Sequence, residues 1–269
     1  MNAPRFLVSI PPFMTDAGTA VELAVDAEQA GWDGVFLWDH LQWSPRIRPP
    51  VHDPWVLLGA IAQATERVRI GTLVTPLTRR RLQVVAKHLI TLDHLSNGRV
   101  TFAVGLGEPP AEDFADFGDE SDPKVRGAML DEGLDVLDRL LRGDPVDHHG
   151  EHYQVKAHLR PGPVQRPRPP IWVAGVVPNT RPLARARRWE GVAPIGQGDL
   201  LTPEVLAAYL GDDPSLNPPG WDVVASFSPD HPATAYADVG VTWLVESAWP
   251  AEDDWLEDFR SRIKDGPAR

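Results

Sequence analysis

Eight short runs of apolar, largely β-branched residues recur along the chain, and stretches with helical spacing of apolar residues separate them. The run 68–74 is hydrophobic almost throughout, which is typical of strands covered on both faces in a parallel sheet. The expected strands are 5–10, 34–38, 68–74, 100–104, 171–174, 192–195, 223–227 and 243–246. Strands that alternate with helices over 269 residues predict an α/β protein, a single (β/α)8 TIM barrel over residues 1–269.

Helix signals fall between these strands. The stretch 19–30 carries its apolar residues on one stripe and is followed by Gly31, a typical helix stop. Asp53 and Pro54 form an N-cap followed by proline at the first helical position. A longer helix with regularly spaced leucines ends at Gly143. These signals support βα units.

Two long segments interrupt the alternation. Residues 108–122 are rich in acidic residues, glycine and proline, and we interpret them as an active-site loop that acts as a lid. Residues 144–170 are interpreted as an excursion before the fifth strand that closes the barrel. A second domain that begins at the prolines of 161–170 is the alternative. The three or four βα units that follow are too few to close a barrel by themselves.

Composition narrows the function classes. A formal net charge of −12 disfavours binding to nucleic acids and to anionic lipid surfaces. The chain has no cysteine, so disulfides, thiolate metal sites and cysteine nucleophiles are excluded. No apolar stretch is long enough to span a membrane, and no export signal is visible at the N-terminus. We therefore expect a cytoplasmic protein that acts on a small-molecule substrate.

Barrel enzymes build their sites at the carboxyl ends of the strands. His40 follows the second strand between two tryptophans, and it is either a general acid or base or a packed histidine bonded to a backbone carbonyl. Gly105 and Gly107 follow the fourth strand and would let the backbone approach a flat ligand. Glu108 comes next, and it either forms an acid and base pair with His40 or is a solvated loop carboxylate.

Three further segments suggest ligand binding. The arginines of 79–81 either attract a phosphate or carboxylate or pair with nearby acids at a solvated helix start. The loop 174–181 is a plausible phosphate cradle after the fifth strand, and Gly196 opens the loop after the sixth. The histidines of 148–152 suggest a metal, but consecutive residues of a strand point to opposite faces. No metal site is expected.

Taken together, several motifs resemble the bacterial luciferase-like flavin-dependent oxidoreductases. They are GWDGVFLWDH at 31–40, GTLVTP at 71–76, TLDHLSNGR at 91–99, GLGE at 105–108, GEHY at 150–153 and PIWVAG at 170–175. The resemblance extends from about residue 6 to residue 198. It implies a luciferase-like TIM barrel with a flavin across the strand ends, either FMN or the 8-hydroxy-5-deazaflavin F420, and chemistry by hydride transfer.

The resemblance also implies roles for individual residues. A bulge with a non-prolyl cis peptide between Leu73 and Val74 would support the flavin ring. His40 and Glu108 would be catalytic, and Trp43 would lie near the substrate. The cofactor-binding residues implied by the resemblance and by position are Asp39, Leu73, Val74, Thr75, Gly105, Gly107, Ala174, Gly175, Val176 and Gly196.

These observations predict an oxidoreductase that uses F420 or FMN for hydride transfer to or from a small organic substrate. An FMN-dependent monooxygenase supplied with reduced flavin by a partner reductase is one alternative, and a non-catalytic flavin-binding barrel is another. A metal-dependent hydrolase is a third, with few candidate ligands. A homodimer is expected from family habit. Residues 200–269 lack the long insertion that often caps the substrate pocket in the family, so the substrate cannot be transferred from a relative.

Overall fold

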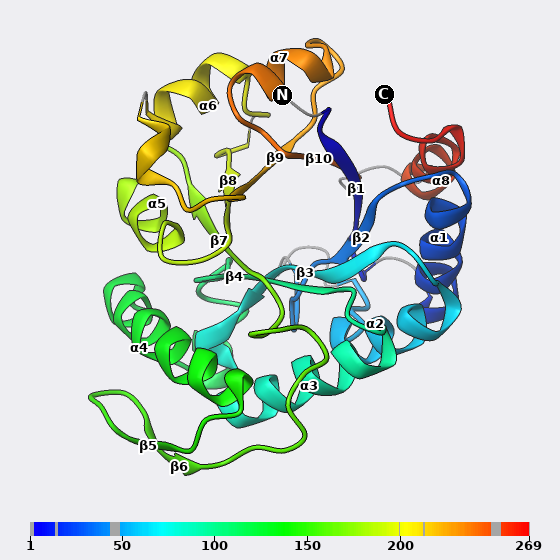
Figure 1. The fold of residues 1–269 in the computed structure, drawn as a ribbon. Helices are drawn as coiled ribbons and strands as arrows, with labels where there is room; N and C mark the ends of the chain where they lie inside the picture. The colour runs from blue at the N-terminus through cyan, green and yellow to red at the C-terminus, as the bar shows by residue number, and fades with distance from the viewer. Residues whose placement is uncertain are drawn as a thin grey trace.

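Eight parallel strands close into a barrel in the computed structural model, which describes residues 3–13, 16–43, 49–198, 200–211, 213–248 and 254–268. Figure 1 looks along the barrel. In spatial order the strands are β1 (Arg5–Ile10), β10 (Trp243–Ser247), β9 (Asp222–Ser226), β8 (Gly191–Ile195), β7 (Ile171–Val176), β4 (Val100–Gly105), β3 (Arg69–Pro76) and β2 (Gly34–Leu37). All eight predicted strands are confirmed, each end within two residues of its predicted position.

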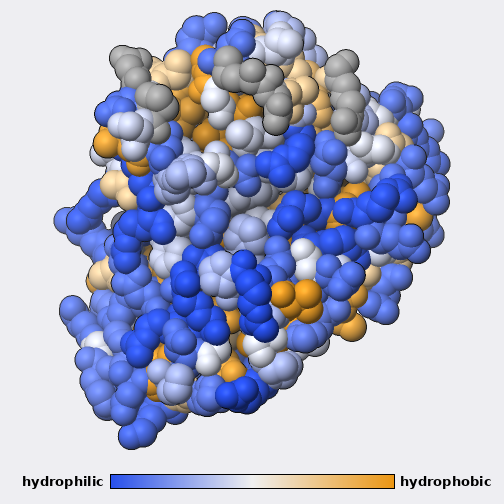
Figure 2. Space-filling view, in the orientation of Figure 1, coloured by the Kyte–Doolittle hydropathy of each residue, from blue (hydrophilic) through white to orange (hydrophobic). Residues whose placement is uncertain are grey.

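Helices surround the barrel (Figure 1). They are α1 (Ala17–Gln29), α2 (Pro54–Ala64), α3 (Leu82–Leu95), α4 (Pro123–Arg142), α5 (Thr180–Ala186), α6 (Pro203–Leu210), α7 (Ala233–Asp238) and α8 (Trp255–Asp265). Side-chain caps begin several of them, as Asp53 does for α2, and Gly143 ends α4 in the left-handed conformation. Figure 2 shows a largely hydrophilic face in the same orientation. Among the helices described, none combines the length and apolar character needed to cross a membrane.

The excursion 144–170 adds no strand to the barrel. It forms an antiparallel hairpin, β5 (Val146–His149) with β6 (Gln154–Ala157), which lies outside the barrel beside α4 (Figure 1). The prediction that this segment closes the barrel is wrong, because β4 pairs directly with β7. Farther along, Gln165 bonds to the Asp93 side chain and to the Val100 carbonyl, which fastens the segment beneath the start of β4.

Large aromatic side chains fill the amino-terminal half of the barrel. Phe36 stacks on Trp172 with ring centroids 5.3 Å apart, and Trp172 meets Trp243 edge to face at 5.6 Å. The guanidinium of Arg5 lies 4.0 Å from the Trp243 ring centroid and pairs with Asp222 at 2.6 Å. Because this end is packed, the large cavity of the barrel lies toward the carboxyl ends of the strands.

Gly71 lies where β3 runs closest to β4. A Cβ at Gly71 would lie 2.0 Å from the Thr101 carbonyl oxygen and 2.9 Å from an edge carbon of Phe36. We expect Gly71→Ala to lower the free energy of unfolding by about 1–3 kcal/mol, measured by urea denaturation. Gly59→Ala in α2 is the matched control, because a Cβ there has no neighbour within 4 Å, and it should be neutral or stabilising. Equal losses in both variants would contradict the prediction.

Candidate active site

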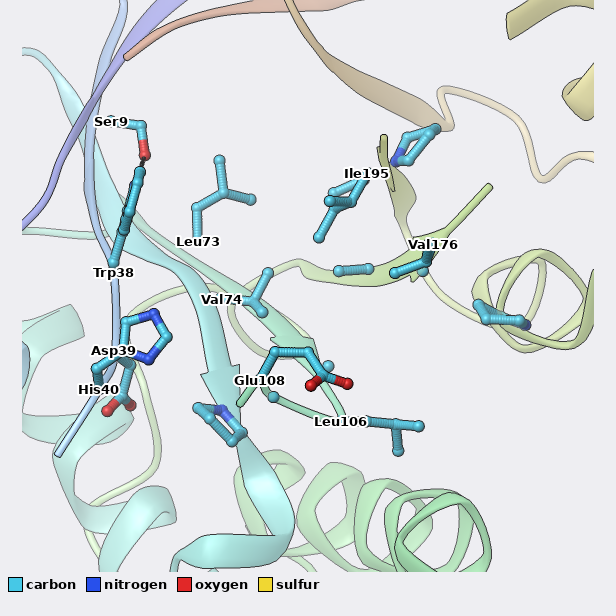
Figure 3. A pocket seen from close by; sticks show the side chains of 18 of the residues that line it. Ser9, Trp38, Asp39, His40, Leu73, Val74, Leu106, Glu108, Val176 and Ile195 are labelled. Atoms are coloured by element: carbon cyan, nitrogen blue, oxygen red, sulfur yellow. Dashed lines mark hydrogen bonds between the residues drawn. The ribbon is translucent and has the colours of Figure 1, made fainter. Parts of the chain in front are cut away.

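A cavity of about 1010 Å³ opens at the carboxyl ends of the strands (Figure 3). Most of its wall is apolar, with a few polar groups that converge from different strands. This combination of a large apolar space and a few placed polar groups is typical of cofactor and substrate sites. The residues that line it include Leu73, Val74, Ala174, Val176, Ala193, Ile195, Val224 and Val245 on the apolar side and Ser9, His40, Glu108, Asn179, Ser226 and Ser247 on the polar side.

Most of the residues predicted for the site lie together around this cavity. They are Asp39, His40, Trp43, Leu73, Val74, Gly105, Gly107, Glu108, Ala174, Gly175 and Val176. Thr75 is fully buried behind the wall, where its hydroxyl donates to the Asp39 carboxylate at 2.8 Å. Gly196 follows the end of β8 and does not line the cavity. Thr75 therefore contacts the cavity wall through Asp39. In β8 the cavity is lined by Pro194 and Ile195, which precede Gly196.

The bulge in β3 forms one side of the cavity. The peptide bond between Leu73 and Val74 is cis, and the pairing of β3 with β4 shifts register between Thr72 and Thr75. Both features implied by the family resemblance are thus confirmed. Figure 3 shows the Leu73 and Val74 side chains extending from β3 into the cavity. The bulge therefore presents two apolar side chains where a regular strand would turn one of them away.

Gly105, which ends β4, and Gly107, which follows it, pack against β3 near the bulge. A Cβ at Gly105 would lie 3.1 Å from Val74 Cγ2, and one at Gly107 would lie 2.6 Å from Pro76 Cβ. The space that each glycine leaves is therefore occupied by protein atoms. Both glycines also line the cavity, so their predicted contact with a flat ligand stays a prediction beside this packing role.

His40 forms a hydrogen-bonded pair with Asp113, a residue that the sequence analysis did not single out. Its Nδ1 lies 2.8 Å from Asp113 Oδ2, and the Asp113 side chain is fully buried. An ionised Asp113 only accepts hydrogen bonds, so His40 carries its proton on Nδ1 when neutral. Nε2 is then an acceptor. His40 thus lies at the cavity wall with Nδ1 bonded to a buried carboxylate, and the alternative of a histidine bonded to a backbone carbonyl does not hold.

Asp113 is kept ionised by the groups around it. Burial by itself raises the pKa of this carboxyl, but the hydrogen bonds from His40 and from the Gln42 backbone, together with the Arg79 charge, outweigh burial and hold the pKa below its ordinary value. Oδ1 accepts from the backbone N–H groups of Leu41 and Gln42, each at 3.0 Å. The segment 108–122 is thereby fastened onto the loop that carries His40.

A second buried carboxylate, Asp39, neutralises the arginines that follow β3. Its Oδ1 accepts from Arg79 at 2.7 Å and from Arg80 at 2.6 Å, and Trp55 Nε1 donates to Oδ2 at 3.2 Å. Arg79 also donates to Asp113 at 2.6 Å. These two arginines therefore pair with nearby acids, as one of the two sequence interpretations held, and their largely buried side chains do not line the cavity.

Glu108 lies on the rim of the same cavity as His40 (Figure 3). Its side chain is exposed, and the turn before it is secured by the buried Arg126, which donates to the carbonyl oxygens of Leu106 and Gly107 at 2.9 and 3.1 Å. Glu108 is thus a carboxylate held at the mouth of the cavity in contact with solvent.

One arginine side chain lies on the side of the cavity formed by β7 and α5. Arg185 lines the cavity near Asn179 and pairs with Asp131 through two hydrogen bonds of 2.6 and 2.9 Å. Arg181, predicted in the same cradle, is exposed and does not line the cavity. Of the polar side chains near the predicted phosphate cradle, Asn179 and Arg185 face the cavity, together with the turn that precedes them.

The histidines of 148–152 lie on the β5–β6 hairpin, outside the barrel (Figure 1). His148 Nε2 meets Glu132 Oε1 at 2.8 Å, and His149 Nδ1 meets Gln154 Oε1 at 2.9 Å, so the two side chains have separate partners. Over the part of the chain that the structure describes, no three His, Asp or Glu side chains gather in a metal-binding arrangement. Glu132 instead fastens the hairpin to α4.

The sequence matches the family model described as luciferase-like monooxygenase over residues 5–209. An F420-dependent glucose-6-phosphate dehydrogenase of Beutenbergia cavernae is 38% identical over 195 residues, which cover 69% of this chain and 55% of that protein. The corresponding protein of Microbacterium testaceum is 34% identical over 231 residues, which cover 78% of this chain and 65% of that protein. The chain thus spans about half to two thirds of the length of these curated relatives.

Solved structures share the fold over nearly the whole chain. An F420-dependent secondary alcohol dehydrogenase in complex with an F420-acetone adduct superposes with a TM-score of 0.75 at 19% identity, and the match covers 98% of this chain and 99% of that one. The F420-dependent tetrahydromethanopterin reductase of Methanopyrus kandleri gives a TM-score of 0.73 at 16% identity, with the same coverage. At such identities the likeness establishes the barrel alone.

Proposed function

This chain belongs to the luciferase-like monooxygenase family, and on that premise we propose that it is an oxidoreductase that exchanges a hydride between F420 and a small organic substrate. The observation that carries the proposal is the His40–Asp113 pair at the wall of a large apolar cavity with the β3 bulge on one side. The choice of F420 over FMN is supported by the relatives of 34–38% identity, which are named as F420-dependent dehydrogenases.

The residues around the cavity suit a flat, partly apolar cofactor with an anionic tail. Leu73 and Val74 would support one face of its ring, and the apolar wall formed by Ala174 and Val176 continues from them. Asn179 and Arg185, on the β7 side, would receive the anionic part. Asp39 at the wall and Thr75 behind it would hold the shape of the cavity. The proposed binding set is completed by Gly105, Gly107 and Gly175.

When bound, F420 supplies a two-electron acceptor and donor of hydride. In the direction of substrate oxidation, His40 Nε2 accepts the proton of a substrate hydroxyl. Asp113 holds the ring in the correct tautomer and stabilises the imidazolium that forms. The two buried carboxylates and the two buried arginines next to it balance in charge, so the added proton is not repelled by a net positive cluster. Glu108 at the rim would pass that proton to solvent.

Equilibrium binding to F420 and to FMN tests the proposal. We expect the purified protein to bind F420 more tightly than FMN. Binding would be measured by the change in cofactor fluorescence and by the quenching of tryptophan fluorescence from the cavity wall. Trp38 and Trp43 line the cavity, so their emission reports its occupancy. Binding of FMN alone would favour a monooxygenase fed by a partner reductase. Binding of neither would overturn the proposal.

Several predictions stay open beside it. A non-catalytic flavin-binding barrel would bind cofactor but leave it unreduced with every donor. A homodimer, a reductase partner and a cytoplasmic location stay predictions from the sequence and from family habit. The loop 108–122 is proposed as the active-site loop, because it brings Glu108 to the rim and Asp113 to His40.

A further inference from the structure

We propose that the substrate is a neutral, largely apolar alcohol or carbonyl compound that carries no phosphate or carboxylate group. The inference rests on the proposed function for its reaction, but it concerns the part of the cavity opposite Arg185. It is carried by the side chains that β9, β10, β1 and the loop after β2 place there, all on neighbouring strands of the barrel.

Three serines on three adjacent strands form the polar part of this region. Ser9 at the end of β1 is in register with Ser247 of β10, and Val245 of β10 is in register with Ser226 of β9. All four line the cavity, as does Val224 below Ser226. The wall therefore offers neutral hydroxyls above apolar side chains, which suits a ligand with one or two uncharged polar groups.

Aromatic rings complete the wall next to the proton acceptor. Trp38 Nε1 donates to the Ser9 hydroxyl at 2.8 Å, a bond drawn in Figure 3. Trp43 stacks on Phe13 with ring centroids 5.0 Å apart, and its ring centroid lies 4.7 Å from that of His40. A substrate hydroxyl placed at His40 would therefore have the rest of its molecule against tryptophan faces and serine hydroxyls.

The cations that the structure describes near the cavity have carboxylate partners. Among the described lining residues the one Lys or Arg is Arg185, which follows β7 and is already paired with Asp131. In the closed order of eight strands, β7 stands four positions from β1, on the opposite side of the barrel. Arg79 and Arg80 pair with buried carboxylates behind the wall and do not line the cavity.

The rim next to His40 adds negative charge. Glu108 and Glu112 both line the cavity mouth. An anionic substrate would lose hydration on entry without gaining a cationic partner in the described wall, and it would pass two like charges. A neutral substrate has no charge to desolvate and is not repelled by the two carboxylates.

The relatives named for glucose 6-phosphate do not establish that the substrate of this chain is a phosphate. A dianionic sugar phosphate requires several charged donors at its phosphate. The wall that would have to supply them here includes Ser226, Val245 and Ser247, which lie beyond residues 5–209 of the family match. The similarity that identifies the family therefore does not extend to the part of the wall formed by β9 and β10.

A pair of probes and one added cation test the inference. Saturation-transfer NMR on the F420-loaded protein would compare titrations of cyclohexanol and glucose 6-phosphate, and F420 reduction would be followed in parallel. We expect cyclohexanol to bind and glucose 6-phosphate not to bind. Ser226→Arg should raise the affinity for glucose 6-phosphate by about tenfold or more and weaken binding of cyclohexanol. Ser261→Arg, on the exposed side of α8, makes the same charge change away from the cavity and should behave as wild type.

Each outcome has one meaning. Tighter binding of glucose 6-phosphate than of cyclohexanol to the wild-type protein, or binding of neither probe, overturns the substrate class while the cofactor proposal stands. An equal gain in Ser226→Arg and Ser261→Arg would show a general charge effect and would also overturn it. Failure to load F420, measured beforehand by cofactor fluorescence, overturns the proposed function instead.

Discussion

Asp113→Asn is expected to lower kcat by roughly 10²–10⁴-fold while F420 still binds, because the substitution reverses the tautomer of His40. The backbone N–H groups of Leu41 and Gln42 both donate to Oδ1 of the carboxylate. In the variant they would keep the amide oxygen at that position and turn the amide nitrogen toward His40, which also deprives Arg79 of the oxygen to which it donates in the wild type. That nitrogen donates to Nδ1, so the imidazole proton moves to Nε2 and the base facing the cavity is lost.

Two measurements check this prediction independently. Steady-state rates give kcat and KM, and we expect the loss in kcat. Nitrogen NMR of histidine-labelled protein, with the His40 signals assigned from a His40→Gln variant, should show the proton on Nδ1 in the wild type and on Nε2 in Asp113→Asn. Asp119→Asn is the matched control, because Asp119 is an exposed acid of the same loop. A wild-type rate or an unchanged tautomer in Asp113→Asn would contradict the role of Asp113.

Acid stability provides a third readout for the same variant. The pKa of Asp113 in the folded protein lies below its ordinary value, so its contribution to stability is fully present above about pH 3.9. The contribution is lost as the pH falls through the lowered pKa. The wild type should therefore lose stability more steeply than Asp113→Asn below about pH 4. Parallel stability curves would show that Asp113 is not ionised in the folded state.

The fold was predictable from the sequence because burial on both faces leaves a simple mark. Strands such as β3 and β7 are near-continuous apolar runs, and helix caps such as Asp53 and Gly143 have local chemical causes. The mouth of the barrel was predictable for the same reason, since His40 follows directly from the end of its strand. Position in the chain sufficed for these features.

Asp113 escaped prediction because its role depends on a contact across 73 residues. Residues 108–122 contain several acidic residues, and periodicity cannot select among them in a loop. One signal was present, since the segment has two phenylalanines, and Phe114, adjacent to Asp113, is fully buried whereas Phe117 is exposed. The partners of the arginines at 79–81 could not be predicted either, because the sequence does not distinguish an arginine that pairs with a buried acid from one that binds a ligand.

Asp39→Ala is expected to lower the free energy of unfolding by about 3–5 kcal/mol, because it leaves two buried cations without their main partner. The side chains of Arg79 and Arg80 are 2% and 15% exposed, and both donate to the Asp39 carboxylate. In the wild type burial lowers the pKa of Arg80, but the Asp39 charge and hydrogen bond outweigh burial and hold the pKa above its usual value. Asp39→Ala removes that support, but a guanidinium stays charged in proteins, so the variant leaves a largely buried cation without its main partner.

Urea denaturation of single and double variants isolates this effect. If the loss in Asp39→Ala arises from uncompensated charge, adding Arg80→Met should recover part of it, and the double variant should be more stable than the sum of the two single losses implies. Asp147→Ala is the control, because its pair with Lys156 is exposed on the hairpin and should contribute less than about 1 kcal/mol. Strictly additive losses would mean that Asp39 stabilises the barrel by packing alone. Positive coupling would instead tie the shape of the cavity wall to the neutrality of the buried cluster behind it.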